Sequence, residues 1–300
     1  SRDVMDAQVS PGKLEEVFGL VANQSRIDVL LELWKQYPDP IAFSDLRAAV
    51  GMENSGKFNY HLNVLRPEFV RKGEEGYRLT FAGREAIGVS VSGSFTAADT
   101  VDIGRVPAGT CMFCTGRLEA VYEEGHVVVT CSDCEELLAK LPISPISIST
   151  VEPERVPDVF SDHLLILAHT LSSGFCTHCR GRVEASLTAL SDEESVTYRD
   201  TLDVRFDCQQ CGDWTNLNVG GVLMNHPVVT SFLFDAGIDL HDRGTYVWEV
   251  LPLLDPDENL AGGEDPRLEL RFEIDERLLE LTVDDSVTVV DYEYPDRLPS

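Results

Sequence analysis

Apolar side chains in the first ninety residues recur at the three- and four-residue spacing of amphipathic helices. The pattern predicts four successive helices ahead of a hairpin, the third in SDLRAAVG and the fourth in NSGKFNYHLNVL. We expect Ser44 to cap the start of the third helix and Gly51 to end it, because these residue types favour those positions. The residues expected to face a core are Leu14, Val17, Phe18, Val21, Ile27, Leu30, Leu31, Trp34, Phe58, Leu62 and Leu65.

The periodicity then changes to strand, turn, strand in FVRKGEEGYRLT, with the turn between Gly73 and Gly76. Thr80 is the expected cap of a closing helix in TFAGREAIG. A tight turn from Gly51 to Asn54 separates the third and fourth helices, as a helix-turn-helix requires. This order of elements predicts a winged helix, in which one helix enters a DNA major groove and the hairpin contacts the backbone or minor groove.

All eight cysteines fall into four Cys-x-x-Cys pairs, and the segment CMFCTGRLEA recurs as CTHCRGRVEA. Sixteen residues separate the first two pairs and twenty-eight separate the last two. Two such turns can complete a tetrahedral thiolate shell, which predicts two zinc ribbons, each holding a structural Zn²⁺ with no open coordination position. The predicted ligands are Cys111, Cys114, Cys131, Cys134, Cys176, Cys179, Cys208 and Cys211.

Pairing within each unit is the local arrangement, and an exchange of pairs between the units stays open. A thioredoxin-like motif would place one Cys-x-x-Cys at a helix start, whereas these pairs come in twos and are followed by glycine or a strand. Disulfides are disfavoured in a cytoplasm, where we expect the chain to act. We expect His178 to be a bystander, and Gly116 and Gly181 to permit the turn after the second thiolate.

Strand-like runs join the cysteine pairs. The first hairpin is expected in LEAVYEEGHVVVT with a turn at 123–125, and the second in RVEASLTAL and VTYRDTLDVRF around the acidic turn SDEES. An amphipathic helix from Pro157 would present Phe160, Leu164, Leu167 and Leu171 on one face.

The pattern of the C-terminal segment predicts a helix interrupted at Pro227, a strand in TYVWEVLPLL, and alternating strands with turns near 275–277 and 284–285. The predicted fold is therefore α+β: an N-terminal winged helix-turn-helix, two zinc ribbons with four cysteine ligands each, and a mixed α/β C-terminal region. The expected divisions are 1–90 for the winged helix, 91–156 for a linker and the first ribbon, 157–215 for a helix and the second ribbon, and 216–300 for the C-terminal region.

Charge separates one segment from the rest of the chain. The sequence has 24 Lys+Arg against 52 Asp+Glu, a net charge of −28, yet residues 54–84 carry a net charge of +3. A basic patch in an acidic chain favours DNA as a partner. The candidate DNA-contacting residues, which lie off the apolar face of the fourth helix or on the hairpin, are Ser55, Lys57, Asn59, Tyr60, Asn63, Arg71 and Lys72. We expect the adjacent His61 to pack inside.

The segments SDLRAAVG and NSGKFNYHLNVL resemble the ArsR-like winged-helix regulators of haloarchaea, over about residues 13–88. The resemblance implies DNA binding as a homodimer on a roughly palindromic site. The acidic, lysine-poor composition is also similar to that of haloarchaeal proteins, which work in molar salt. No cysteine precedes Cys111, so the heavy-metal sensing of that family does not carry over.

The sequence therefore predicts a transcriptional regulator that binds double-stranded DNA as a homodimer, with zinc ribbons in a dimerisation or sensing region and the effector left open. The alternative is a transcription-machinery adaptor that binds proteins through the same parts. We expect no enzyme, because His226, Asp235, Asp239 and His241 fit surface or capping roles better than a catalytic one. No apolar run is long enough for a transmembrane helix.

Overall fold

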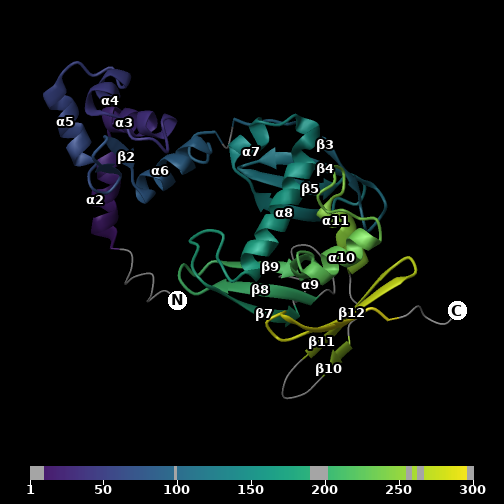
Figure 1. The fold of residues 1–300 in the computed structure, drawn as a ribbon. Coiled ribbons are helices and arrows are strands. Elements are labelled where there is room, and N and C mark those ends of the chain that lie inside the picture. The colour runs from purple at the N-terminus through teal and green to yellow at the C-terminus, as the bar shows by residue number, and fades with distance from the viewer. Residues whose placement is uncertain (1–9, 98–99, 190–201, 255–258, 262–266, 296–300) are drawn as a thin grey trace. The chain divides into compact units, whose positions relative to one another are not determined.

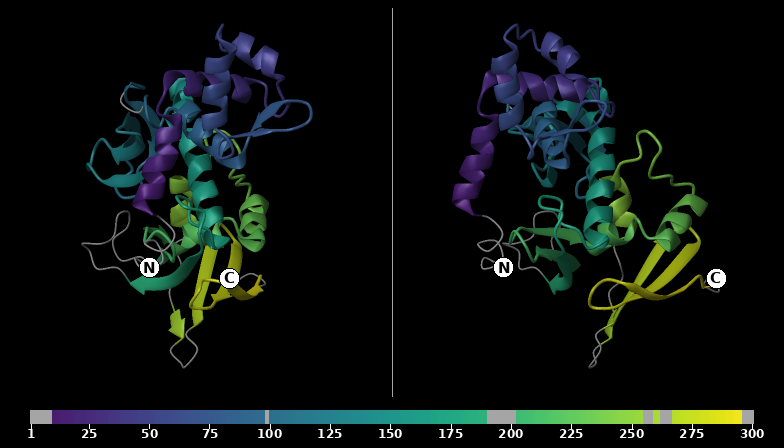
Figure 2. Two further views of the ribbon diagram at one scale, coloured as in Figure 1. Left: turned by 90° about the vertical axis from the view of Figure 1, so that its left-hand side faces the viewer. Right: turned by 60° about the vertical axis from the view of Figure 1, so that its left-hand side comes forward.

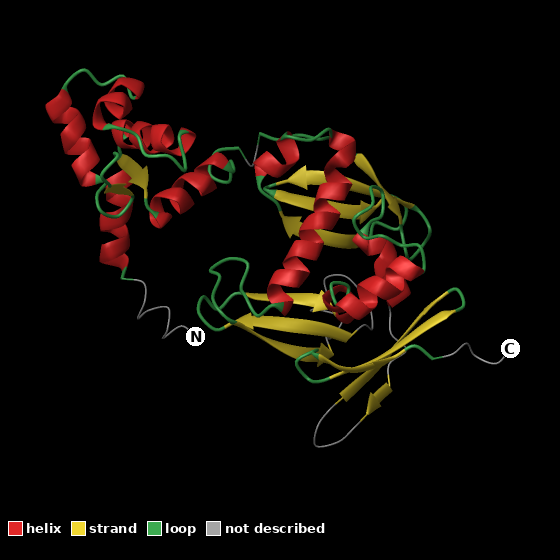
Figure 3. Cartoon of the chain, in the orientation of Figure 1, coloured by secondary structure: helices red, strands yellow, loops and turns green. Residues whose placement is uncertain are grey.

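A computed structural model describes residues 10–97, 100–189, 202–254, 259–261 and 267–295. Within these residues lie helices and four small antiparallel sheets, which confirms the predicted α+β class. Residues 3–98 and 99–300 form two compact units. The first is mainly helical, whereas most of the strands belong to the second (Figures 1 and 3).

The first unit packs its helices and one hairpin around a single core. Phe58, Leu62 and Leu65 are fully buried there, as the pattern of NSGKFNYHLNVL predicts. Gly51 follows its helix with φ 72°, and the Thr80 hydroxyl accepts a hydrogen bond from the N–H of Gly83 at 3.1 Å, also as predicted. The elements are α2 (Pro11–Val21), α3 (Gln24–Lys35), α4 (Phe43–Ala49), α5 (Ser55–Val64), β1 (Val70–Lys72), β2 (Tyr77–Leu79) and α6 (Phe81–Val91).

Three helix predictions in this unit are wrong. On α3, Ile27 is 38% exposed and does not face the core. α4 begins at Phe43, so Ser44 lies inside the helix and its hydroxyl bonds the Asp45 carboxylate instead of capping the backbone. In α2, Leu14 and Phe18 are 41% and 66% exposed, because this terminal helix contacts the core along one edge only.

A single bridge between Ile41 and Tyr77 ties the β1–β2 hairpin to the chain that precedes α4. The adjacent Gly76 has φ 145°, and a Cβ atom at this position would collide with the carbonyl group of Ile41. Glycine is therefore required here by both its conformation and its close backbone contact.

The second unit begins with the first cysteine module, residues 106–142, a sheet in the order β3-β4-β5-β6. Glu124 and Gly125, both with positive φ, join β4 to β5 where the sequence predicts the turn. Its strands are β3 (Val106–Thr110), β4 (Arg117–Glu123), β5 (His126–Cys131) and β6 (Leu137–Pro142).

The second cysteine module, residues 175–218, is a sheet in the order β7-β8-β9. The predicted acidic turn SDEES lies outside the described residues. The strands are β7 (Val183–Ala189), β8 (Leu202–Cys208) and β9 (Trp214–Asn218).

Helix α8 (Val156–Ser172) connects the two modules, after the short helices α7 (Pro145–Ser149) and η1 (Pro153–Arg155). Its N-terminal half buries Phe160 in the core of the first module, and its C-terminal half buries Leu171 in the core that includes the second (Figure 1). Leu164 and Leu167 are half-buried, so the predicted apolar face is confirmed.

The C-terminal elements complete the second core. The helix break at Pro227 and the strand turns near 275–277 and 284–285 are confirmed. Helix α10 lies beside the C-terminal sheet in both Figures 1 and 2. The elements are α9 (Val219–Leu223), α10 (Pro227–Asp235), α11 (Val247–Val250), η2 (Leu251–Leu254), β10 (Asn259–Ala261), β11 (Arg267–Ile274), β12 (Arg277–Val283) and β13 (Val289–Glu293).

The predicted strand TYVWEVLPLL is wrong, because the segment forms α11 and η2. The reason is an irregularity in β3 at Gly109, which has φ 94° and breaks the pairing with β4. The Trp248 indole N–H donates to the carbonyl of Ala108 at 2.9 Å, and the Glu249 carboxylate accepts from the N–H of Thr110 at 2.8 Å. The consecutive side chains of Trp248 and Glu249 thus provide hydrogen-bond partners for the β3 backbone groups on either side of the bulge at Gly109.

Candidate metal centres and nucleic-acid interface

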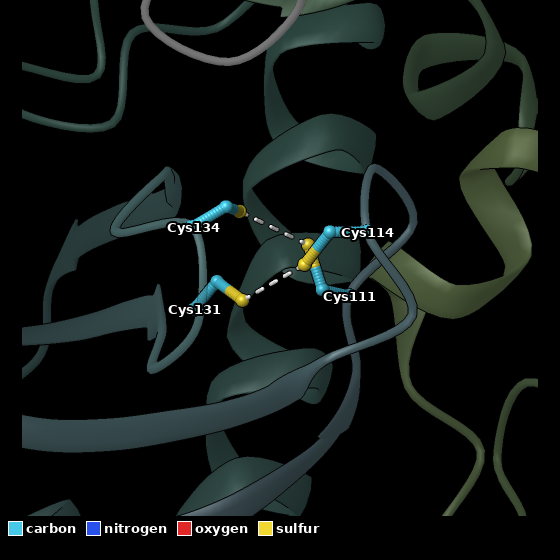
Figure 4. A group of neighbouring side chains, drawn as sticks. All are labelled: Cys111, Cys114, Cys131 and Cys134. Atoms are coloured by element: carbon cyan, nitrogen blue, oxygen red, sulfur yellow. Dashed lines mark hydrogen bonds between the residues drawn. The ribbon is translucent and has the colours of Figure 1, made fainter.

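The two Cys-x-x-Cys turns of the first cysteine module bring four thiols together. Figure 4 shows Cys111 and Cys114 facing Cys131 and Cys134. The first two cysteines follow β3, Cys131 is the last residue of β5, and Cys134 lies in the turn after it. The sulfur atoms of Cys111 and Cys134 lie 3.8 Å apart, and those of Cys114 and Cys131 lie 3.4 Å apart. All four sulfur atoms fall within 4.8 Å of one another, so this group could hold a metal ion.

The second cysteine module repeats this geometry. The sulfur atoms of Cys176 and Cys211 are 3.8 Å apart, and those of Cys179 and Cys208 are 3.4 Å apart. These four also lie within 4.8 Å of one another. The structure therefore brings together the four cysteines of each cysteine module, which is the local pairing that the sequence favours.

Each turn has the same backbone form. The residue after the second cysteine has a positive φ in all four turns, and these residues are Thr115, Glu135, Arg180 and Gly212. Backbone N–H groups point at the sulfur atoms, as in the bonds from Phe113 to Cys111 and from His178 to Cys176, both 3.4 Å. Such donors stabilise thiolate, the form that binds metals.

Gly116 and Gly181 have a different role from the predicted one. The left-handed residues are Thr115 and Arg180, directly before these glycines. A Cβ atom at Gly116 would instead collide with the side chain of Asp133, and one at Gly181 with that of Gln210. Asp133 and Gln210 occupy equivalent places in the opposite turns, so each glycine allows the two turns of its module to approach.

The thiol pKa values show why a cation fits these groups. The N–H groups of Cys134 and Asp133 lower the pKa of Cys131 to about 7, despite its burial. The N–H of Gly116 favours the Cys114 thiolate, but the neighbouring Cys131 and Cys134 raise its pKa to about 12.

The second module repeats the contrast. Burial opposes ionisation of Cys208, but the N–H groups of Cys211 and Gln210 lower its pKa to about 7. The Asp213 N–H favours the Cys211 thiolate, yet burial and the other thiols raise its pKa to about 12. A bound divalent cation supplies the charge that lets four thiolates coexist.

His178 lies at the rim of the second group. Its Nδ1 is 2.7 Å from a carboxylate oxygen of Asp213, and these two residues with Cys176 form a further set close enough to hold a metal. Among the described residues, no potential metal-binding set includes His226, Asp235, Asp239 or His241. His226 instead caps α10, and Asp239 accepts from the N–H of His241.

The seven candidate DNA-contacting residues all lie on the solvent-exposed surface of α5 or β1. Tyr60 is 64% exposed, and the other six side chains are also exposed to solvent. Asn54 caps α5 by accepting a hydrogen bond from the N–H of Lys57 at 2.9 Å. His61 is buried as expected, and its Nδ1 has no partner among the described residues. Burial, followed by the charges of Arg26 and Lys57, lowers its pKa.

The two strands of the hairpin carry three basic side chains, whereas Glu74 and Glu75 lie in its turn. Arg71 stands directly opposite Arg78, beside the pair of Lys72 and Tyr77. Like charges placed opposite each other across two strands are destabilising unless an anion lies between them. The sequence pattern puts Arg78 on the second strand of the hairpin, and the structure pairs it with Arg71.

Comparisons with known proteins give two family matches. The model of the family described as Domain of unknown function (DUF7351) matches residues 108–289, more than half of the chain. That of Domain of unknown function (DUF7347) matches residues 14–89. No curated protein and no solved structure shows a significant match. Within the described residues, no helix has both the length and the apolar character needed to cross a membrane.

Proposed function

The chain belongs to the DUF7351 family, and we propose that it is a transcriptional regulator that binds double-stranded DNA as a homodimer and carries two structural zinc sites. One observation carries the proposal: the exposed face of α5 and the β1–β2 hairpin is basic in a chain of net charge −28. Phosphate groups are the ligand that such a patch fits best.

The arrangement of the first unit supports a winged helix. The turn through Gly51 separates α4 from α5, and the bridge from Ile41 to Tyr77 adds a short third strand segment to the hairpin. In a winged helix α5 would enter the major groove, and Arg71 and Arg78 would contact phosphates or the minor groove. The resemblance of these segments to ArsR-like regulators of haloarchaea agrees with this assignment.

A second copy of the chain is the proposed partner for α2. Leu14 and Phe18 leave an apolar stripe on this helix exposed, and none of its residues is buried. Pairing of two such stripes would remove apolar surface from water. It would also supply the two-fold symmetry that a palindromic DNA site requires.

Zinc fits the cysteine groups by size and chemistry. Four sulfur atoms about 2.3 Å from a zinc ion define a tetrahedron with edges of about 3.8 Å. Two of the sulfur separations in each module, 3.8 and 3.4 Å, lie close to that edge length. When bound, zinc would hold the two turns of each module together, and a shell of four thiolates leaves no position for a substrate.

The test is binding of DNA selected from a random duplex library, measured by fluorescence anisotropy from about 0.5 to 2 M KCl, where screening weakens counterion release. We expect Lys57→Ala and Arg71→Ala each to weaken binding about tenfold or more, the usual cost of one good contact. Lys35→Ala, which removes the same charge from the exposed end of α3, is the matched control and should bind like the wild type. Equal binding by all four proteins would refute the placement of the interface.

A wild-type protein that selects no DNA but co-purifies with RNA polymerase or a basal factor would instead support the adaptor alternative. The logarithmic slope of affinity against salt is a further readout. We expect it to be shallower than about −6, because few phosphate contacts are available to so acidic a chain.

A further inference from the structure

A cavity of about 320 Å³ lies between the two cysteine modules. One wall is β6, the edge strand of the first sheet, and the opposite wall is β9, the edge strand of the second. Helix α8, which connects the modules, and α11 complete the lining. This volume lies in the range of small-molecule sites, and such sites favour the junctions between structural modules.

Apolar side chains form most of the wall. Leu138 and Leu141 come from β6, and Leu164 and Leu167 come from the stripe of α8 that is only half-buried. A ligand with a flat apolar body would cover this surface and gain the free energy of removing it from water.

Asn216 places an unsatisfied polar group in this apolar wall. Both its Oδ1 and Nδ2 atoms are inaccessible to solvent and have no hydrogen-bond partner among the described residues. Its cross-strand neighbour Arg205 forms no hydrogen bond with it. The guanidinium group of Arg205 instead donates to Asp207 at 2.9 Å and lies 4.5 Å from the centre of the Trp214 ring. A buried amide without partners is costly, so a donor and an acceptor are missing from this site.

The amide of Asn216 selects among polar groups. A neutral carboxamide offers it one donor and one acceptor, whereas a carboxylate offers acceptors only and would leave the Asn216 Oδ1 atom unpaired against a second oxygen. The geometry points to a binding site for a small, uncharged aromatic or aliphatic molecule that carries a carboxamide-like edge.

Three probes that share one aromatic ring system separate the contributions: 1-naphthamide, naphthalene and 1-naphthoate, titrated into metal-loaded full-length protein by calorimetry and ligand-observed NMR. We expect naphthamide to bind about five- to tenfold more tightly than naphthalene, the effect of one to two net hydrogen bonds. Naphthoate should bind more weakly than naphthamide, because its carboxylate has no donor for the Asn216 Oδ1 atom.

In Asn216→Leu, a swap of similar volume, naphthamide should lose its advantage while naphthalene binds as well as before. Asn225→Leu is the matched control, since Asn225 lies outside the cavity lining and bonds the carbonyl of Leu165. Thermal melting verifies that both variants are folded, and the order of probe affinities in Asn225→Leu should equal that of the wild type.

Equal affinities for naphthamide and naphthalene in the wild type would overturn the proposal. Retention of the naphthamide advantage in Asn216→Leu, or no binding of any probe at millimolar concentration, would also overturn it. The titration uses no DNA, so its outcome is independent of the proposed regulatory function.

Discussion

The substitution Trp248→Phe tests how α11 holds the first cysteine module. Trp248 is 1% exposed, stacks on Tyr246 with ring centres 4.9 Å apart, and donates to the carbonyl of Ala108, itself fully buried. Phenylalanine keeps most of the apolar contact but removes the donor, so the Ala108 carbonyl loses its partner at the bulge. A lost hydrogen bond that strands a buried carbonyl costs about 1–3 kcal/mol, and the reduced stacking adds about 0.5–1 kcal/mol.

We therefore expect Trp248→Phe to lower the free energy of unfolding of residues 99–300 by about 1.5–4 kcal/mol. For a unit of this size that shifts the melting temperature by about 3–16 °C, measured by calorimetry on metal-loaded protein. Trp214→Phe is the matched control, because Trp214 is 49% exposed and its contact with Arg205 is worth about 1 kcal/mol or less. If both variants melt alike, the indole bond to the bulge does not anchor α11.

Three further outcomes follow from the structure. Cys131→Ser and Cys208→Ser should each reduce the bound metal from two ions to one per chain, as measured by elemental analysis, because each breaks one cysteine group. Gly76→Ala should destabilise residues 3–98 by about 1–3 kcal/mol, since φ 145° and the carbonyl of Ile41 both exclude a Cβ atom; chemical denaturation measures the loss. The pKa of His61 is lower in the folded chain than in the unfolded chain, so as the pH falls the imidazole is protonated in the unfolded chain before the folded one. The free energy of unfolding should therefore decrease as the pH falls below about 6.5. His61→Gln should remove that part of the pH dependence, and an unchanged pH profile would contradict it.

Much of the architecture could be predicted because local patterns determine it. Helical spacing placed Phe58 and Leu62 in the first core, and strand alternation with acidic turns located β11 and β12. The spacing of the four Cys-x-x-Cys pairs indicated which thiols would meet, because each pair is a compact turn that a hairpin brings to its partner.

The features that sequence missed depend on contacts between distant segments. Nothing near Trp248 reveals that its partner is a bulge about 140 positions earlier, and the run around it suits a strand and a short helix equally. The role of Gly116 depends on Asp133 in the opposite turn, and the orphaned amide of Asn216 appears only when the two modules form a cavity. For α2, helical periodicity identified an apolar stripe without showing that much of it faces solvent.

The most direct test of the central claim is genome-wide mapping of bound DNA in cells that express the wild type, Lys57→Ala or Arg71→Ala at equal abundance. We predict discrete, roughly palindromic sites for the wild type and a marked loss of occupancy at those sites in both variants, because both side chains lie on the exposed basic surface of α5 and the hairpin. Occupancy that is the same in all three strains would contradict the assignment of this surface to DNA.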